Sequence, residues 1–100
     1  MSESNKHKPR TSEDWIEAFI ADVQLIYDER SSVYDNKGIP TWDRMSVDSI
    51  LSGVIYRADR ARGTENLNKK YDDIKDAYNY LKFAGAKMKR LLEKNKIGTH

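Results

Sequence analysis

Three stretches of the chain repeat apolar residues every three or four positions, the spacing that gathers them on one face of an α-helix. These stretches cover about residues 13–30, 47–63 and 67–94. The third is the longest, and at about 1.5 Å per residue it would extend roughly 40 Å. No stretch alternates as a strand does. The sequence therefore predicts an all-α fold, a small antiparallel bundle of three main helices that oligomerisation would complete.

Signals for helix ends agree with these stretches. Thr11 with Asp14 three positions later approximates a capping box, and Ser46 is a typical N-cap for the second stretch. Gly63 is expected to end that second helix, because glycine is common just after a helix. The expected division of the chain is a disordered polar tail, a single helical domain and a C-terminal tail, at residues 1–11, 12–94 and 95–100.

Size and charge restrict the classes of function. A chain of 100 residues forms one small domain with a modest core. Charged residues make up 34% of it, but the formal net charge is only +2, which does not favour a strongly basic nucleic-acid binder. This charge weakens the interpretation of the chain as a DNA-binding helical dimer. Such a dimer would use these basic residues: Arg57, Arg60, Arg62, Lys87, Lys89 and Arg90.

Cysteine and histidine usage restricts the chemistry further. The absence of cysteine excludes disulfides and thiolate metal sites, and it agrees with the cytoplasmic location that we expect. His7 and His100 lie near the two ends, so neither a zinc site nor a histidine-based triad is expected. No uninterrupted apolar run of about 18 residues occurs, so no membrane-spanning segment is expected.

Residues 31–45, between the first two stretches, are expected to form a long loop, because they contain turn-forming residues and no helical stripe. Its aromatic and basic side chains are suited to stacking on a base and pairing with phosphate. They are Tyr34, Lys37, Trp42 and Arg44. The alternative is that Tyr34 and Trp42 fold back on the core as a lid.

An acidic cluster occurs early in the third stretch, at Asp72, Asp73 and Asp76. Asp73 and Asp76 are three positions apart and share one side of a helix, so they could supply half of a Mg²⁺ site. Asp48 or Glu29 would complete the site from another helix. The alternative is structural: the aspartates favour the helix N-terminus and pair with lysine and arginine side chains.

A family resemblance bears on these alternatives. The stretch YDDIKDAYNYLKF at 71–83 resembles the second metal helix of the MazG-like, all-α nucleoside triphosphate pyrophosphohydrolases, whose motif is ExxD. Asp73 stands here for the usual glutamate. The upstream stretch YDERSSVYDNKGIPTWDRMSVDSI is similar to a phage-type branch, the nucleotide modification associated domain 1. The similar positions lie between about 15 and 90, at Tyr34, Asp35, Trp42, Ser46, Asp48, Arg57, Arg60, Asp73, Asp76, Asn79 and Tyr80.

The resemblance implies Mg²⁺-dependent cleavage between the α- and β-phosphates of a nucleoside triphosphate or modified nucleotide. The implied metal ligands are Asp73, Asp76, Asp48 and Glu29. The implied nucleotide-binding residues are Tyr34, Asp35, Lys37, Trp42, Arg44, Arg57, Arg60, Asn79 and Tyr80. In this superfamily such sites form between subunits, which implies a homodimer or homotetramer.

Two departures from the family pattern keep a second interpretation open. The first metal motif of the superfamily, ExxE, does not occur in the first two helices, and a lysine common in the second helix has no counterpart. Either the metal site has fewer ligands than is usual in the superfamily, or the chain binds a nucleotide or a partner protein without catalysis. Arginines at the end of the second helix also have a simpler interpretation, since cations there complement the helix dipole.

Overall fold

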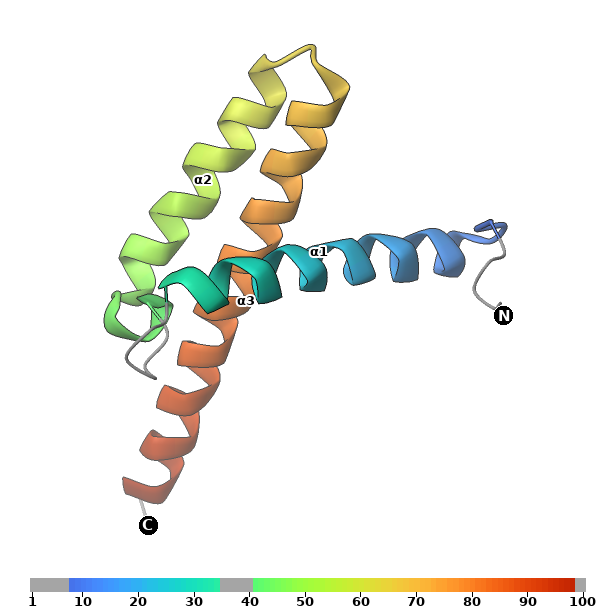
Figure 1. Cartoon of the computed structure of the whole chain (residues 1–100). Helices are drawn as coiled ribbons and strands as arrows, with labels where there is room; N and C mark the ends of the chain where they lie inside the picture. Colours follow the sequence, from blue (N-terminus) through green and yellow to red (C-terminus); the bar gives the residue numbers. More distant parts are fainter. Residues whose placement is uncertain (1–7, 35–40, 99–100) are drawn as a thin grey trace.

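The computed structural model describes residues 8–34 and 41–98 (Figure 1). Its elements, in chain order, are α1 (Ser12–Tyr34), the short 3₁₀-helix η2 (Thr41–Arg44), α2 (Val47–Gly63) and α3 (Leu67–Gly98). No strand occurs within the described residues. The predicted all-α class with three main helices is therefore confirmed.

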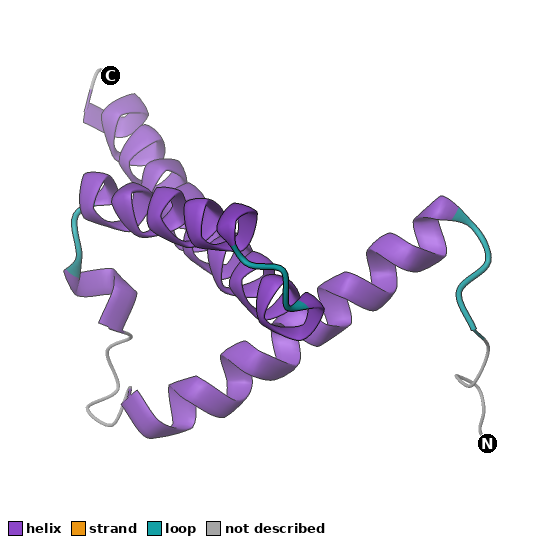
Figure 2. Ribbon diagram, turned by 90° about the horizontal axis from the view of Figure 1, so that it is seen from above, coloured by secondary structure: helices purple, strands orange, loops and turns teal. Residues whose placement is uncertain are grey.

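Helices α2 and α3 form an antiparallel hairpin, whereas α1 crosses α3 steeply (Figures 1 and 2). The expected antiparallel bundle is thus present for α2 and α3, but α1 does not align with them. The contacts that fix this crossing join a short segment near the middle of α1 to α3. Phe19 packs edge-on against Tyr78 at 5.4 Å between ring centroids, and the Tyr71 hydroxyl donates to Asp22 at 2.7 Å.

The N-terminal half of α1 projects away from the hairpin (Figure 1). Only four apolar side chains are buried among the described residues, and they are Val23, Ile50, Ala61 and Ala84. Two of these are alanines, which bury little apolar area. Many large apolar side chains on all three α-helices are exposed instead. The single chain therefore has a small core for its length.

Helix starts follow the predicted caps. The Thr11 hydroxyl accepts from the Asp14 amide, and the Asp14 carboxylate accepts from the Thr11 amide, each at 3.1 Å. The hydrogen bond from the Thr11 amide lowers the pKa of Asp14. The Ser46 hydroxyl accepts from the Ser49 amide at 3.0 Å, and α2 ends at Gly63 as expected. The capping box and both limits of α2 are confirmed.

Two helix ends differ from the prediction. α1 continues to Tyr34, although a loop was expected from residue 31, and α3 continues to Gly98 and not to about Lys94. The segment SSVY at 31–34 contains neither glycine nor proline, so nothing in it stops a helix that has already formed. The turn-forming residues behind the loop prediction all follow Tyr34, so they did not mark a helix end at residue 30.

The 3₁₀-helix η2 is fixed to α3. Trp42 stacks on Phe83 with ring centroids 5.2 Å apart and planes 5° from parallel. Lys87 donates to the Asp43 backbone carbonyl at 2.9 Å, and Arg90 donates to the Asp43 carboxylate at 2.6 Å. The hydrogen bond from Arg90 lowers the pKa of Asp43. The alternative in which the tryptophan folds back on the core is therefore confirmed for Trp42.

Close packing of α2 on α3 depends on Gly53. A Cβ at this position would lie 2.5 Å from two carbon atoms of the Tyr80 ring. Real Cβ atoms do not approach carbon so closely, so any other residue would move the ring or separate the helices. Gly53 therefore provides the space that the Tyr80 ring occupies between α2 and α3.

We expect Gly53→Ala to destabilise the fold. Overpacking costs about 1–3 kcal/mol and alanine recovers about 0.5–1 kcal/mol of helix propensity, so the net loss is roughly 1 kcal/mol. That loss would lower Tm by about 4–8 °C in a domain of this size, measured by circular dichroism. Gly85→Ala is the control, since a Cβ there meets nothing within 4 Å. A Gly53→Ala protein as stable as the Gly85→Ala protein would contradict the packing argument.

Candidate functional site

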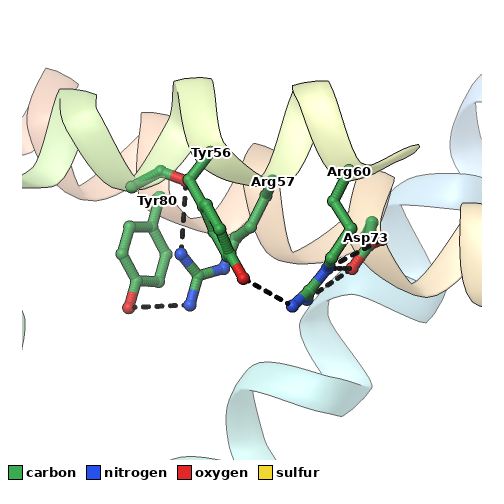
Figure 3. A network of polar contacts seen from close by, with 6 residues as sticks. Tyr56, Arg57, Arg60, Asp73 and Tyr80 are labelled. Atoms are coloured by element: carbon green, nitrogen blue, oxygen red, sulfur yellow. Dashed lines mark hydrogen bonds and ion pairs between the residues drawn. The ribbon is translucent and has the colours of Figure 1, made fainter. Parts of the chain in front are cut away.

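Arginine side chains of α2 meet α3 along one side of the hairpin (Figure 3). Arg57 and Arg60 are three positions apart on α2, so both point to the same side of that helix. Each is held by a different residue of α3, Tyr80 for the first and Asp73 for the second. We call this group the arginine row, and it consists of Tyr56, Arg57, Arg60, Asp73 and Tyr80.

The strongest contact of the arginine row joins Arg60 to Asp73. Nε of Arg60 donates to both carboxylate oxygens at 3.0 and 3.1 Å, and Nη2 donates to Oδ1 at 2.6 Å. Asp73 is buried, while the Arg60 side chain is 50% exposed. The hydrogen bonds from Arg60 lower the pKa of Asp73, and those to Asp73 raise the pKa of Arg60. Both groups are held in their charged forms.

Arg57 is fixed by a second set of contacts. Its guanidinium carbon lies 4.1 Å from the centroid of the Tyr80 ring, within the range of a cation–π interaction. Nη1 donates to the Gly53 carbonyl at 3.2 Å, and Nη2 donates to the Tyr80 hydroxyl at 3.3 Å. Its Nε is buried without a hydrogen-bond partner among the described residues. Arg57 is thus a partly buried cation with unused donor capacity.

The exposed side of the row includes Tyr56. Its hydroxyl accepts from Nη1 of Arg60 at 3.4 Å, and its ring centroid lies 5.1 Å from the Arg60 guanidinium carbon. Arg60 therefore uses three of its five N–H groups on Asp73 and Tyr56, leaving two free among the described residues. A fixed guanidinium with free N–H groups next to an exposed aromatic ring can bind an anion that carries a planar group.

The predicted metal ligand Asp48 lies far along the hairpin from Asp73 and Asp76. Both oxygens of Asp73 accept from Arg60, and Asp76 lies half-buried less than one turn further along α3. Asp48 is twelve positions from Arg60 on α2, which is about 18 Å along that helix. Glu29 lies in α1, but its side chain is outside the described ones. Among the described residues no three carboxylates or histidines form a metal-binding group.

The magnesium prediction is therefore untested. The described donor set does not fit Mg²⁺ as it stands, because the ion would have to displace Arg60 from Asp73. The structural alternative for the acidic cluster is present in two contacts: Asp73 pairs with Arg60, and Asp72 pairs with Lys75 at 3.4 Å.

The predicted nucleotide-binding residues are placed unevenly. Arg57, Arg60 and Tyr80 meet in the arginine row, together with Asp73. Asn79 is buried under α1 and donates to the Val23 carbonyl at 3.4 Å. Trp42 packs on Phe83, which also lies 5.9 Å from Tyr80, and Arg44 is exposed at the end of η2. Asp35 and Lys37 lie outside the described residues, as does the side chain of Tyr34.

Sequence reasoning missed two members of this neighbourhood. Tyr56 lies four positions before Arg60, a spacing at which side chains on a helix meet, and this signal was available. The role of Gly53 could not be found from its own helix, because the side chain that requires a glycine there is Tyr80 of α3.

Comparison of the chain with protein-family models, with curated proteins and with solved structures finds no match. Within residues 8–34 and 41–98, none of the helices has the length and apolar content needed to cross a bilayer.

The Arg60–Asp73 pair predicts a specific acid sensitivity. Because the pKa of folded Asp73 lies below its ordinary value of 3.8, the pair stabilises the fold above that value. This contribution is lost as the pH falls through the lowered pKa. We expect the Tm of wild type to fall more steeply between about pH 5 and 2 than the Tm of Asp73→Asn. Parallel curves for the two proteins would show that Asp73 does not titrate with folding.

The comparison with Asp73→Asn is needed because the pKa values of Asp14 and Asp43 are also lowered. Both carboxyls make the Tm fall as the pH is lowered, and they do so equally in wild type and in Asp73→Asn. Asp43→Asn is a matched control at a separate ion pair, since Asp43 contacts Arg90 and not the arginine row.

Proposed function

We propose that this chain is a MazG-like helical protein that binds the phosphate groups of a nucleotide at the arginine row. The observation that carries the proposal is the geometry of Arg60, which is held by Asp73 and Tyr56 while half of its side chain remains exposed. A guanidinium fixed in this way loses little conformational entropy on binding an anion.

Neighbouring groups support phosphate as the ligand. Arg57 lies three positions before Arg60 and adds a second positive charge on the same side of α2. Arginine is well suited to phosphate because its planar N–H groups match two phosphate oxygens. Tyr56 offers an exposed ring beside Arg60, on which a base can stack. Cation and ring together match the two chemically different ends of a nucleotide.

The proposal is one of binding, and hydrolysis is a separate question. The resemblance implies a pyrophosphohydrolase, but as arranged the described carboxylates supply no set of Mg²⁺ ligands. A binding protein needs only the arginine row. Mg²⁺ held by Asp73 and Asp76 would require Arg60 to leave Asp73.

Self-association is part of the proposal. The chain buries few large side chains and leaves many apolar ones exposed, as expected for a subunit of a homodimer or homotetramer. No partner of another kind is needed to explain this surface.

We expect Arg60→Gln to weaken nucleotide binding at least tenfold, which corresponds to about 1.4 kcal/mol. Isothermal titration calorimetry with a panel of ribo- and deoxyribonucleoside triphosphates, with and without Mg²⁺, measures the change. Arg62→Gln is the matched control, because Arg62 lies on the same helix but contacts Asp59 and no residue of α3 among those described. We expect the control to bind as wild type does.

Three results would revise the proposal. Absence of binding by any triphosphate would reject it, and equal weakening by Arg62→Gln would reduce it to non-specific charge attraction. Release of pyrophosphate from a mixture containing Mg²⁺, abolished by Asp76→Asn, would establish the hydrolase. Circular dichroism of each variant separates lost binding from lost folding.

A further inference from the structure

A line of exposed apolar side chains runs along α3, on a side that neither α1 nor α2 covers. Leu67, Ile74, Leu81 and Met88 follow one another at seven-residue intervals, with exposures of 79%, 43%, 50% and 42%. Leu91 and Leu92 continue the same side and are also exposed. We call these six residues the α3 seam. Residues seven positions apart lie on nearly the same side of a helix, so these side chains form a line against which a second helix can pack.

Helix geometry explains why the seam is open. Successive residues of an α-helix point about 100° apart, so three in a row face three different sides. Asn79 contacts α1, Tyr80 contacts α2, and Leu81 is exposed. The first two sides of α3 are occupied within the chain. The third side, which holds the seam, is left uncovered by the residues that the structure describes.

We propose that a second copy of this chain covers the seam, with the two α3 helices paired antiparallel about a two-fold axis near Leu81. A helix with an apolar line of the same spacing can pack against the seam, and α3 of another copy has that line. A two-fold axis makes the seam its own partner, so one surface serves both subunits. This pairing rests on the self-association proposed above and gives it a surface and a direction, and it can form without a nucleotide at the arginine row.

Charge selects the antiparallel direction. Residues 81–94 carry five basic side chains and one acidic one, for a net charge of +4, whereas residues 67–80 carry three of each sign and are neutral. Parallel helices would set one +4 half against the other. Antiparallel helices set each +4 half against a neutral one, which avoids that repulsion.

The acidic half of α1 adds attraction in the antiparallel arrangement alone. Residues 12–23 contain Glu13, Asp14, Glu17 and Asp22, and no lysine or arginine. α1 crosses the N-terminal half of α3, at Tyr71 and Asn79, and its own N-terminal half projects on the side away from α2 (Figure 1). The basic half of the partner's α3 lies beside that crossing only if the helices are antiparallel.

The same arrangement gives a role to exposed apolar residues of α1. Trp15, Ile16 and Ile20 are exposed on the projecting half of α1. They belong to the helical face that continues into buried Val23, which packs over α3. In the proposed pair, the partner's α3 would also cover exposed residues of this α1 face.

Sedimentation equilibrium tests the seam. We expect wild type to be a dimer at micromolar concentration, and Leu81→Glu with Met88→Glu to weaken dimerisation at least 100-fold. Ile55→Glu is the matched control, since Ile55 is 63% exposed on α2, outside the seam, and we expect it to remain dimeric. A monomeric wild type, or an equal loss in the Ile55→Glu protein, would overturn the proposal.

A second variant guards against a general loss of folding. Gly85 lies beside the seam, and a Cβ there meets nothing within 4 Å in the single chain. Gly85→Gln adds helix propensity to the subunit, but its side chain obstructs a partner helix. We expect a well-folded monomer by circular dichroism and sedimentation. A Gly85→Gln protein that dimerises as wild type does would show that no helix packs against this side of α3.

The direction of pairing is measured with a spin label on Glu93→Cys. The chain has no native cysteine, so the label is unique. Position 93 is twelve residues from Leu81, so two antiparallel copies place their labels about 36 Å apart along the helix axis, at about 1.5 Å for each of 24 residues. Parallel copies place them within about 20 Å, because they then lie side by side across two helix diameters. A short distance in double electron–electron resonance would overturn the antiparallel pairing.

Discussion

Contact between α2 and α3 is the interaction on which the rest of the structure depends. Gly53 leaves space for the ring of Tyr80, and that close approach brings Arg57 within 4.1 Å of the ring centroid. Arg60, almost one turn later, then reaches Asp73. Because the three contacts lie in sequence along the hairpin, a shift of either helix would affect all of them. The arginine row is thus a direct consequence of a missing side chain at one position.

Apolar spacing and capping residues were sufficient to predict the helices, because both are local signals that a single segment contains. The crossing of α1 over α3 is different. It depends on Phe19 and Asp22 meeting Tyr71, two segments almost fifty positions apart, and no spacing within either segment contains that information. Likewise, the sequence allowed Trp42 to bind a base or to fold back, and its local pattern did not show that Trp42 would stack on Phe83.

The site shows the same division between local and distant information. The sequence singled out Arg57, Arg60, Asp73 and Tyr80, and these four residues do meet. It assigned Asp73 to a metal ion and Arg60 to a phosphate, whereas in the structure the two side chains bind each other. Spacing along one helix showed that Asp73 and Asp76 share a side, but it could not show which cation would lie opposite Asp73.

Because one α3 surface faces α2 and an adjacent surface bears the seam, the proposed assembly and the proposed ligand binding would be linked through α3. Asp73 and Tyr80 hold the arginines only while α3 keeps its position against α2, and a single chain with few buried side chains restrains α3 weakly. A second helix packed along the seam, from Ile74 to Met88, would restrain the same turns that carry Tyr80. Pairing of two copies would therefore reduce the conformational freedom that the arginine row must lose on binding an anion.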